Sequence, residues 1–544
     1  MTLSSQSIKK LESLLVRAVG RNEPGIAVGV ARRGQMVWGG ARGVANLAAK
    51  TPMTTQTPFR ICSISKQFAC ALAMREARAG RIDLTAHPSR YLPWTRVLDP
   101  ALTVAHLMQN KSGIRDQWVM AMMMGALPTQ PFTLEDGNTT ARHAPESMFV
   151  PGERNLYCNI NFEIVGQILE AAAGKPYAEL LSTQILTPLG MRDTSLGIDT
   201  SLSIPGDARG YRFHNKVWEE EQNGIHWAAS AGMVSTAEDM LRWAACLYDP
   251  KAAGLPWVTD ILSTTPFNDG NAAQYAAGIN HFAANGRATF QHGGGLRGWK
   301  STLMHFVNEK TSIVVLMNRN NSPRGRMPRA VAYSVATALG ILPVWRRKGV
   351  KPVSAPLPRG TAGAWVSREQ GLLICLRQNK GRAEMYSSLD WSKLMRADHP
   401  RTLVTEDGDL RLMFSGDGGM TLADAQENVC TPMRRVGGRT KGVAKDAATG
   451  AAKQFAGRGV YRCAPLGGSA AISSARGKTT LTFTGIFGSG ERYPLTVLDA
   501  HTAYFDLMRG VDEAPPGRVL VIHDPHEQCI ELSANLARRI VFRR

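Results

Sequence analysis

The stretch "FRICSISKQFACALAMREARAGRI", Phe59 to Ile82, places a lysine three residues after a serine at the head of an apolar segment. Residues i and i+3 share one face of a helix, so Ser63 and Lys66 project into the same space if a helix begins near Ser63. The spacing of Phe68, Leu72 and the alanines between them favours such a helix, and Gly80 is expected to end it. The stretch therefore predicts a helix whose first turn carries a hydroxyl beside an amine.

This pair of side chains has a chemical use. A serine becomes a nucleophile when a base removes its proton, and a lysine is such a base when burial or a nearby positive potential lowers its pKa. Lys66 in the first turn would lie near the positive end of the helix dipole. Cys62 is a competing nucleophile, but it lies one residue off the Lys66 face, which favours a small buried thiol.

The length and amino-acid composition are typical of a soluble globular enzyme. The chain has 544 residues, 44% hydrophobic and 20% charged, which predicts roughly three domains. The N-terminal "MTLSSQSIKKLESLLVRAVG" is an amphipathic helix with charges that a signal peptide lacks, and no segment is apolar enough for a membrane span. Eight scattered cysteines without a CxxC pair predict neither a disulfide framework nor a zinc site. We expect a cytoplasmic protein without membrane attachment or cofactor.

The net charge of +20 raises the question of nucleic-acid binding. Basic residues gather in "VWRRKGVK" (344–351), "MRRVGGRTKGVAK" (433–445) and "RRIVFRR" (538–544). The first two are interpreted as connectors and the third ends the sequence, and no RNA- or DNA-binding module accompanies them. We therefore expect solvated basic segments and no specific nucleic-acid partner.

The order of elements predicts the fold of the N-terminal part. Two strands around Arg33-Gly34 are followed by the Ser63 helix and by roughly two hundred residues of helices and loops. Strands resume with "RATFQHGGG", "WKSTLMHFV" and "TSIVVLMNRN", and "RAVAYSVATALG" supplies a closing helix. Strands first, helices between and strands last predict one mixed sheet flanked by helices.

A change of composition divides the rest of the chain. The proline-rich, basic stretch 341–360 predicts a linker after a catalytic domain at 1–340. The stretch 438–453, rich in glycine, alanine and lysine, predicts a second linker. Strand-like runs at 361–437 and 454–544 open with similar phrases, "AGAWVS" and "GRGVYRC". They predict a weak repeat of two small antiparallel β-barrels and a multidomain α+β protein.

Two further motifs give the Ser63 helix partners. "YCN", Tyr157 to Asn159, stands at a predicted helix start, and "QHGGGLRGW" begins at Gln291 between two strands. With "FRICSISK" and "LTVAHLMQNKSGI" (102–114), they occur in the order and spacing of the serine penicillin-recognising hydrolases, which the chain resembles over about residues 7–340. That group contains class C β-lactamases and D-alanyl-D-alanine carboxypeptidases.

The resemblance implies a role for each matching residue. Ser63 attacks the carbonyl and becomes acylated, Lys66 takes its proton, and Tyr157 shares proton transfer and protonates the leaving amine. Asn159 orients the substrate amide, and the N–H groups of Ser63 and Gly295 form the oxyanion hole.

His292 marks a departure from the family. It stands where a Lys-Thr-Gly motif has its lysine, and we place it in the expected catalytic set with Ser63, Lys66 and Tyr157. A histidine is mostly neutral at pH 7, which argues against tight binding of a substrate carboxylate and hence against carboxypeptidase or β-lactamase activity. Arg297 or Lys300 can restore that charge.

The two trailing β units resemble one branch, the D-stereospecific aminopeptidases, in which two antiparallel β-barrels follow the catalytic domain. There a loop of the last barrel enters the active site and helps bind the free α-ammonium. The matching stretch is "GIFGSGERYP" (485–494), in which Gly488, Ser489, Gly490 and Glu491 are expected to bind substrate. Ser489 stands where the branch has an aspartate, and Ser230 also replaces an expected acid. A plain flexible hairpin is the alternative.

Three other patterns are interpreted as structural. "GGGLRG" satisfies GxGxxG, but a strand follows it, which argues against a dinucleotide site. "HDPHE" (523–527) lacks a third metal ligand, and His106 lies in a helical context.

We expect a serine hydrolase that releases N-terminal D-residues, small ones such as D-alanine above all, from short peptides, amides or esters. The partners implied are such substrates with a free amine, and β-lactams as inhibitors. The sequence leaves open whether the chain forms a homodimer. Two alternatives also stay open: an esterase or amidase with no demand for a free amine, and a penicillin-binding sensor that acylates without turnover.

Overall fold

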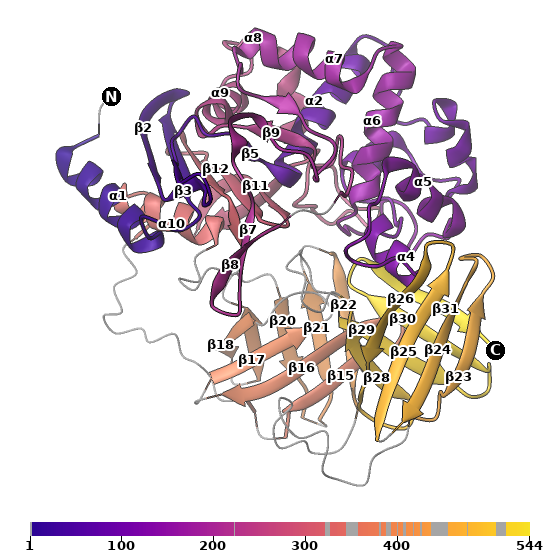
Figure 1. Cartoon of the computed structure of the whole chain (residues 1–544). Coiled ribbons are helices and arrows are strands. Elements are labelled where there is room, and N and C mark those ends of the chain that lie inside the picture. The colour runs from indigo at the N-terminus through magenta and orange to yellow at the C-terminus, as the bar shows by residue number, and fades with distance from the viewer. Residues whose placement is uncertain are drawn as a thin grey trace.

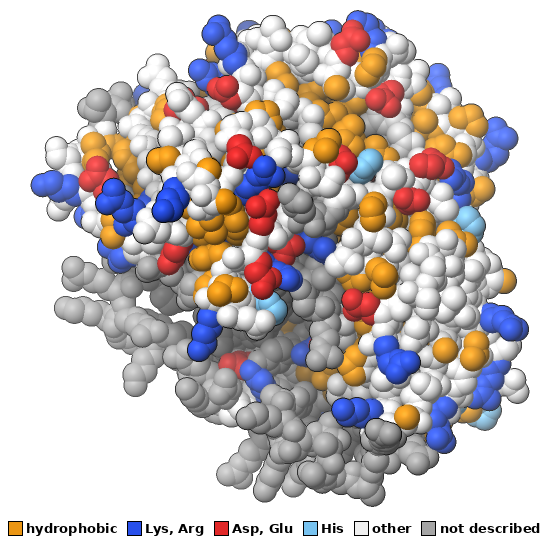
Figure 2. All heavy atoms as spheres, viewed as in Figure 1, with side chains coloured by type: hydrophobic (Ala, Val, Ile, Leu, Met, Phe, Trp, Pro, Cys, Tyr) orange, Lys and Arg blue, Asp and Glu red, His pale blue; other side chains and the backbone are white. Residues whose placement is uncertain are grey.

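The structure is a computed structural model. It describes residues 3–221, 224–284, 286–320, 327–343, 357–358, 360–379, 382–387, 393–399, 401–405, 410–416, 418–424, 427–436, 455–475, 477–507 and 518–544. An N-terminal part of helices and strands lies above two antiparallel β units (Figure 1). On the visible face of the N-terminal part, Lys and Arg side chains alternate with Asp and Glu (Figure 2).

A six-stranded sheet forms the centre of the N-terminal part. Its order is β10 (Asn280–Ala284), β11 (Arg287–Leu296), β12 (Trp299–Phe306), β13 (Thr311–Met317), β1 (Ile26–Arg32) and β2 (Gln35–Arg42). All five pairings are antiparallel, which corrects the expectation of a mixed sheet. The reason is that β1 inserts beside β13 in the reverse direction, so no parallel crossover is needed.

Helices cover both faces of this sheet because its strands alternate between two cores. On β12, Leu303 belongs to one buried cluster and Met304 to the other. Helices α1 (Ser5–Ala18) and α10 (Pro328–Ala338) pack on the Met304 face, while α2 (Ser65–Arg78) and α9 (Ala237–Tyr248) contribute to the Leu303 cluster.

The insertion between β2 and β10 forms a helical lobe. It contains α3 (Val104–Met108), α4 (Gln117–Met123), α5 (Leu134–His143), α6 (Asn159–Ala173), α7 (Tyr177–Leu181) and α8 (Thr187–Leu189). Short strands form three small sheets beside this lobe. One pairs β3 (Val44–Asn46) with β4 (Thr51–Pro52), and one has the order β5 (Phe59–Arg60), β9 (Met233–Ser235), β6 (Ser195–Leu196). The third has the order β14 (Arg319–Asn320), β7 (Tyr211–His214), β8 (Val217–Glu220). In the described ranges, every helix lacks the length and apolar character that a membrane crossing requires.

The first C-terminal unit is a closed antiparallel barrel, as predicted. Its strands are β15 (Gly363–Ser367), β16 (Leu372–Asn379), β17 (Arg382–Ser387), β18 (Lys393–His399), β19 (Thr402–Thr405), β20 (Leu410–Phe414), β21 (Met420–Asp424) and β22 (Val429–Val436). Pairing of β15 with β22 closes it, so it has no free edge.

The second C-terminal unit is a curled nine-stranded sheet. Its strands are β23 (Gly459–Cys463), β24 (Gly468–Ala475), β25 (Lys478–Gly485), β26 (Gly488–Pro494), β27 (Thr496–Val497), β28 (Thr502–Asp506), β29 (Arg518–Asp524), β30 (Cys529–Ala534) and β31 (Ala537–Arg543). The edge strands β26 and β27 are separated in sequence by Leu495 alone, so the two edges meet and the sheet is barrel-like although no ladder closes it.

The phrases "AGAWVS" and "GRGVYRC" form the first strands, β15 and β23, of these two units. The linker predicted at 438–453 lies outside the described residues, as do 344–356 and 359 of the linker predicted at 341–360.

Candidate active site

Ser63 lies in a short 3-10 turn, Cys62–Ile64, that leads directly into α2. The preceding Cys62 has φ of 54°, in the left-handed region that a residue with a Cβ rarely adopts. This turn is held by Ser65, whose Oγ donates to the Cys62 carbonyl at 2.6 Å, and by Ser301, whose Oγ donates to the Ile61 carbonyl at 2.7 Å. The strained turn at Ser63 is thereby held by hydrogen bonds from two side chains.

Lys66 is fully buried, and its Nζ lies 3.1 Å from Ser63 Oγ. It also lies 2.9 Å from Asn159 Oδ1 and 2.9 Å from the Ser230 carbonyl, two groups that only accept from it. A neutral amine satisfies these contacts by donating its two protons to the two acceptors and pointing its lone pair at Ser63. Burial lowers the Lys66 pKa to about 7, which makes the neutral form available near neutral pH.

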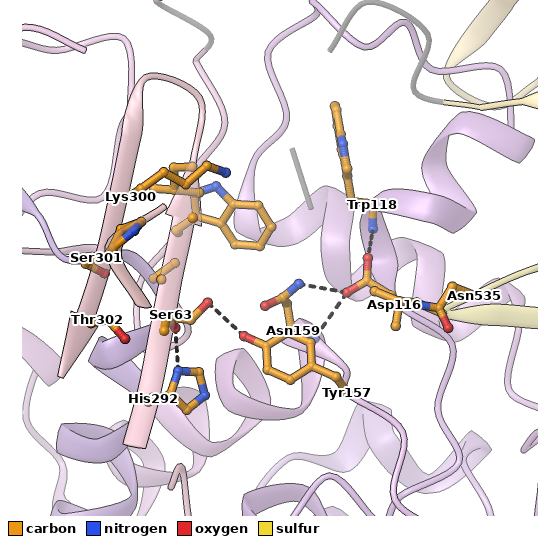
Figure 3. Close-up of a pocket in the computed structure, with 18 of the residues that line it drawn as sticks. Ser63, Asp116, Trp118, Tyr157, Asn159, His292, Lys300, Ser301, Thr302 and Asn535 are labelled. Atoms are coloured by element: carbon orange, nitrogen blue, oxygen red, sulfur yellow. Dashed lines mark hydrogen bonds between the residues drawn. The ribbon is translucent and has the colours of Figure 1, made fainter. Parts of the chain in front are cut away.

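Tyr157 donates its hydroxyl proton to Ser63 Oγ at 2.7 Å (Figure 3), and Lys66 Nζ lies 4.8 Å from the centroid of its ring. It directly precedes Cys158, the N-cap residue of α6, whose N–H donates to Asn110 Oδ1 at 3.1 Å. Burial raises the Tyr157 pKa, so the phenol keeps its proton. The predicted set of Ser63, Lys66, Tyr157 and Asn159 is thus brought together.

Two buried carboxylates complete this centre, and the sequence analysis missed both. Asp116 accepts from the Asn159 backbone N–H at 3.1 Å and from its Nδ2 at 2.9 Å (Figure 3). With Nδ2 held in this way, Asn159 Oδ1 accepts from Lys66. Its other oxygen caps α4 at Trp118. The sequence signal was available, because an aspartate before the apolar run "QWVMAMMM" is a helix N-cap pattern.

Glu163 is the second missed carboxylate. It accepts from the Ser230 hydroxyl and from the backbone N–H groups of Ala228, Ala229 and Ser230 at 3.1 to 3.3 Å. Ser230, which stands where the resemblance led us to expect an acid, therefore contacts Glu163 with its hydroxyl and Lys66 with its carbonyl. The charge of Glu163 raises the Lys66 pKa, against the larger effect of burial.

Two hydrogen bonds and burial hold the His292 ring in its neutral form. Its Nδ1 lies 2.6 Å from the Gly293 carbonyl, which only accepts, so Nδ1 carries the proton. Its Nε2 lies 2.9 Å from the Tyr275 hydroxyl and, in the neutral ring, accepts from it. Burial lowers the His292 pKa to about 3, which keeps the ring neutral. His292 thereby links strand β11 to Tyr275, and its assignment to the catalytic set stays a prediction.

The glycines of "HGGG" allow β11 to approach the turn that carries Ser63. A Cβ on Gly294 would lie 2.2 Å from Ser301 Oγ and 2.5 Å from the Ile61 carbonyl oxygen, so no side chain fits there. Strand β10 pairs with β11 only as far as Gln291. The edge from His292 to Leu296 therefore faces the cavity, as predicted for a strand that lines a cleft.

A cavity of about 510 Å³ opens over Ser63. Its described walls are mostly apolar and include two indoles; they comprise Trp118, Val119, Trp227, Ala231, Leu296, Met327, Pro328, Leu507, Ala534 and Leu536. Lys300 brings a cation to the wall beside Gly295. Asp116 is the one carboxylate residue among the described lining residues, and its oxygens already accept from Asn159 and the first turn of α4.

The predicted 485–494 loop contacts the catalytic domain, but away from this cavity. Residues 485 to 488 form a tight turn between paired strands, and the Phe487 N–H donates to the Met124 carbonyl at the end of α4 at 3.2 Å. Of the predicted substrate-binding residues, Gly488, Ser489 and Glu491 are exposed and Gly490 is half-buried. The structure does not bring these four residues to Ser63.

Another hairpin of the same sheet reaches the cavity. The turn between β30 and β31 places Asn535 and Leu536 in the wall, and Figure 3 shows Asn535 beside Asp116. The Leu536 carbonyl accepts from the Asp116 backbone N–H at 2.9 Å. Sequence reasoning missed this turn because "SANLAR" contains no glycine or charge pattern that marks a binding loop.

The remaining candidate residues and motifs of the sequence lie in structural positions. Cys62 is buried, and burial raises its pKa to about 12, which disfavours a thiolate. His106 caps α3 together with Thr103. "GGGLRG" runs along β11 into β12, without a helix. The described residues hold no group of three His, Cys, Asp or Glu side chains suited to a metal ion.

The pKa of Lys66 predicts how activity depends on pH. The neutral amine is the base, so kcat/KM for an uncharged ester such as p-nitrophenyl acetate should rise about tenfold per pH unit below about 7 and level off above it. Glu163→Gln removes a negative charge that raises this pKa, so the midpoint should move to lower pH. Stopped-flow or steady-state pH profiles measure both midpoints.

Glu76→Gln is the matched control, since Glu76 is a buried glutamate of α2 paired with Arg75 and Arg81. Its midpoint should match the wild type. A Glu163→Gln midpoint that stays in place or moves to higher pH contradicts the assignment of Lys66 as the titrating base.

Comparison with known proteins agrees with this geometry. Residues 11–337 match the family described as beta-lactamase, and residues 357–543 match the description D-aminopeptidase, domain B. The chain is 30% identical over 519 residues to the D-aminopeptidase of Brucella melitensis biotype 2, with 93% of each chain covered. The chain belongs to the beta-lactamase family and, within it, to the D-aminopeptidases.

Solved structures share the fold at lower identity. The octameric penicillin-binding protein homologue from Pyrococcus abyssi is 19% identical, with a TM-score of 0.55 over 78% of this chain and 100% of that one. The D-amino acid amidase from Ochrobactrum anthropi SV3, complexed with L-phenylalanine amide, is 22% identical, with a TM-score of 0.52 over 62% of this chain and 98% of that one.

Proposed function

We propose that this chain is a serine hydrolase that releases N-terminal D-residues from short peptides, amides or esters through an acyl-enzyme on Ser63. The observation that carries the proposal is the position of Ser63 Oγ, 3.1 Å from Lys66 Nζ and 2.7 Å from the Tyr157 hydroxyl, at the floor of the cavity. A base and a proton donor thus contact the nucleophile at once.

Acylation begins when neutral Lys66 takes the Ser63 proton and Ser63 Oγ bonds to the substrate carbonyl carbon. The carbonyl oxygen gains the negative charge, which the N–H groups of Ser63 and Gly295 stabilise. The Tyr157 phenol then gives its proton to the departing amine as the bond from carbon to nitrogen breaks. The Lys66 ammonium, whose Nζ lies 4.8 Å from the centroid of the Tyr157 ring, then returns a proton to the Tyr157 phenolate, so both groups regain their starting protonation states.

Deacylation follows the same path in reverse. A water molecule takes the place of the amine, gives a proton to neutral Lys66 and attacks the carbonyl carbon of the ester. The bond from carbon to Ser63 Oγ breaks, and Ser63 regains a proton. The products are the free D-amino acid and the unchanged enzyme.

The cavity accommodates more than alanine. Its volume of about 510 Å³ and the indoles of Trp118 and Trp227 fit a bulky apolar or aromatic side chain. A loop that enters the cleft would restrict it to small residues, but no residue of the 485–494 hairpin is among the described residues that line this cavity. We therefore propose that D-phenylalanine amide is at least as good a substrate as D-alanine amide.

One observation favours a second function, that of an esterase or amidase without a demand for a free amine. A free α-ammonium needs an acceptor, preferably a carboxylate. Among the described lining residues, Asp116 is the one candidate, and Asn159 and α4 already occupy its oxygens. The two functions differ in how they treat an N-acetyl group.

Side-by-side assays of D-Phe, L-Phe and N-acetyl-D-Phe amides, with the corresponding alanine series, test the proposal. Hydrolysis of the free D-amides, well above that of the L- and N-acetylated amides, supports the D-aminopeptidase. Equal rates on free and N-acetylated amides support the esterase or amidase. Equal rates on D- and L-amides overturn stereospecificity.

The same chemistry predicts reaction with penicillins, because the groups that attack an amide also open a strained lactam. Benzylpenicillin should acylate Ser63 slowly and remain bound as one adduct per chain, visible by intact-mass spectrometry. The Ser63→Ala variant is the control and should gain no adduct. Rapid catalytic hydrolysis of benzylpenicillin would instead indicate a β-lactamase.

A further inference from the structure

The turn that closes the substrate cavity is held by a residue of its own hairpin. Arg538 is 7% exposed, and its Nε donates to the Asn535 carbonyl at 3.1 Å. Its Nη2 lies 3.4 Å from Asn535 Oδ1. One guanidinium therefore fixes both the backbone and the side chain of Asn535, which lines the cavity.

A residue of the barrel holds that guanidinium in turn. Arg538 Nη2 lies 2.9 Å from each oxygen of Glu427, at the start of the turn that leads into β22. The next residue, Asn428, anchors this turn to the catalytic domain through the Glu153 carbonyl at 3.2 Å and Asp269 Oδ2 at 3.1 Å. Figure 1 shows β22, the β30–β31 side of the C-terminal sheet and α4 next to one another.

The hairpin also contacts two consecutive residues before α4. Arg115 Nε donates to the Arg538 carbonyl at 3.3 Å, and the Asp116 N–H donates to the Leu536 carbonyl at 2.9 Å. Asp116 positions Asn159, which contacts Lys66. These hydrogen bonds, with the residues that join them, thus connect the barrel through Arg538 and Asp116 to Lys66.

We propose that the Glu427–Arg538 ion pair makes the barrel part of substrate selection: it fixes the Asn535–Leu536 turn as a wall of the cavity. The barrel then acts on the substrate without touching it. Glu427 and Arg538 are positioning residues, and the substrate contacts come from Asn535 and Leu536. This inference rests on the proposed function, since it concerns the same cavity.

The ion pair is suited to this role because it is desolvated. The Glu427 side chain is 16% exposed and the Arg538 side chain is 7% exposed. Loss of the Glu427 charge therefore leaves the buried Arg538 guanidinium without its counter-ion. The Arg368–Asp524 pair joins the same two C-terminal units, but Arg368 is 54% exposed and neither residue lines the cavity. That pair supplies a matched control.

The test compares Glu427→Gln with Asp524→Asn, each a carboxylate changed to a carboxamide. Substrates are D-phenylalanine amide, whose acyl group carries a benzyl side chain that would contact the wall, and p-nitrophenyl acetate, whose acyl group carries only a methyl. In Glu427→Gln, KM for the amide should rise roughly tenfold with kcat within about twofold, and kinetics on the acetate should be unchanged. Asp524→Asn should leave both substrates unchanged.

Two results overturn the inference. One is that Glu427→Gln behaves as Asp524→Asn on both substrates. The other is an equal loss of kcat on both substrates, which indicates general damage to the fold. If Glu427→Gln does not fold, Asn535→Ala removes the held side chain directly and should raise KM for the amide alone; an unchanged KM overturns the inference as well.

A wild-type enzyme without activity on D-amides would refute the proposed function but leave this inference testable. The rate of acylation by benzylpenicillin then replaces the amide assay. Glu427→Gln should change that rate several-fold relative to Asp524→Asn, because the bulky acyl group meets the same wall. Equal rates in the two variants would overturn the inference in this setting.

Discussion

Ser63→Ala should lower kcat by at least about four orders of magnitude on every substrate, with the fold intact. Without Oγ, neither Lys66 nor Tyr157 has a group to act on, and no acyl-enzyme forms. Cavity and backbone stay in place, so circular dichroism and the melting temperature should match the wild type. Steady-state rates on D-phenylalanine amide and p-nitrophenyl acetate measure the loss.

Cys62→Ala is the control, since the thiol is adjacent in sequence. Cys62 Sγ lies 3.2 Å from the Arg60 carbonyl and is buried against the neighbouring strands, so its loss should reduce stability modestly and leave kcat within a few-fold. Most activity retained in Ser63→Ala, or lost in Cys62→Ala at full folding, contradicts the assignment of the nucleophile.

Lys66→Met should be nearly as damaging, with a loss of about three to four orders of magnitude in kcat. Methionine keeps the length of the side chain but supplies no lone pair to Ser63, and it leaves Asn159 Oδ1 and the Ser230 carbonyl without a donor. Because Ser63 and Lys66 act as one unit, the double variant Ser63→Ala/Lys66→Met should be no worse than Ser63→Ala alone.

Lys111→Met separates catalysis from burial. Lys111 is also a buried lysine of the catalytic domain, but its Nζ donates to Thr265 and to the Pro266 carbonyl. Its loss should lower the melting temperature and leave most of kcat. A Lys66→Met variant that keeps as much kcat as Lys111→Met would show that Lys66 is structural.

The arrangement of Ser63, Lys66 and Tyr157 could be predicted because their motifs have fixed local geometry. Ser63 and Lys66 are three residues apart at a helix start, so helix periodicity alone places them together. Glycines in "HGGG" indicated a close approach of backbone, and Gly294 does lie against Ile61 and Ser301. Strand-like runs of residues likewise predicted β11 to β13 and the strand-rich character of the two C-terminal units.

Contacts between distant segments could not be predicted in this way. Asp116 and Glu163 support Asn159 and Lys66 through hydrogen bonds whose partners are 43 and more residues away. Which hairpin of the last sheet reaches the cavity depends on how that sheet curls and docks on α4. The glycine-rich composition of 485–494 marks a tight turn, whereas the turn at 534–537 is fixed by Arg538 and the backbone around Asp116.

The role of His292 shows the same limit. Its place in the motif indicated a catalytic group, but its protonation is set by two partners, the Gly293 carbonyl and Tyr275, and by burial. Tyr275 lies in a loop without a recognisable pattern. The chemical state of a buried side chain therefore needs the three-dimensional contacts.

The most direct test is to map the acyl-enzyme. The protein is mixed with excess D-phenylalanine methyl ester, quenched in acid during turnover and digested, and the peptides are fragmented in a mass spectrometer. We predict one D-phenylalanyl group, as an ester on Ser63, in the wild type and none in Ser63→Ala. A thioester on Cys62, a label on another residue, or turnover in Ser63→Ala at the wild-type rate would contradict the account.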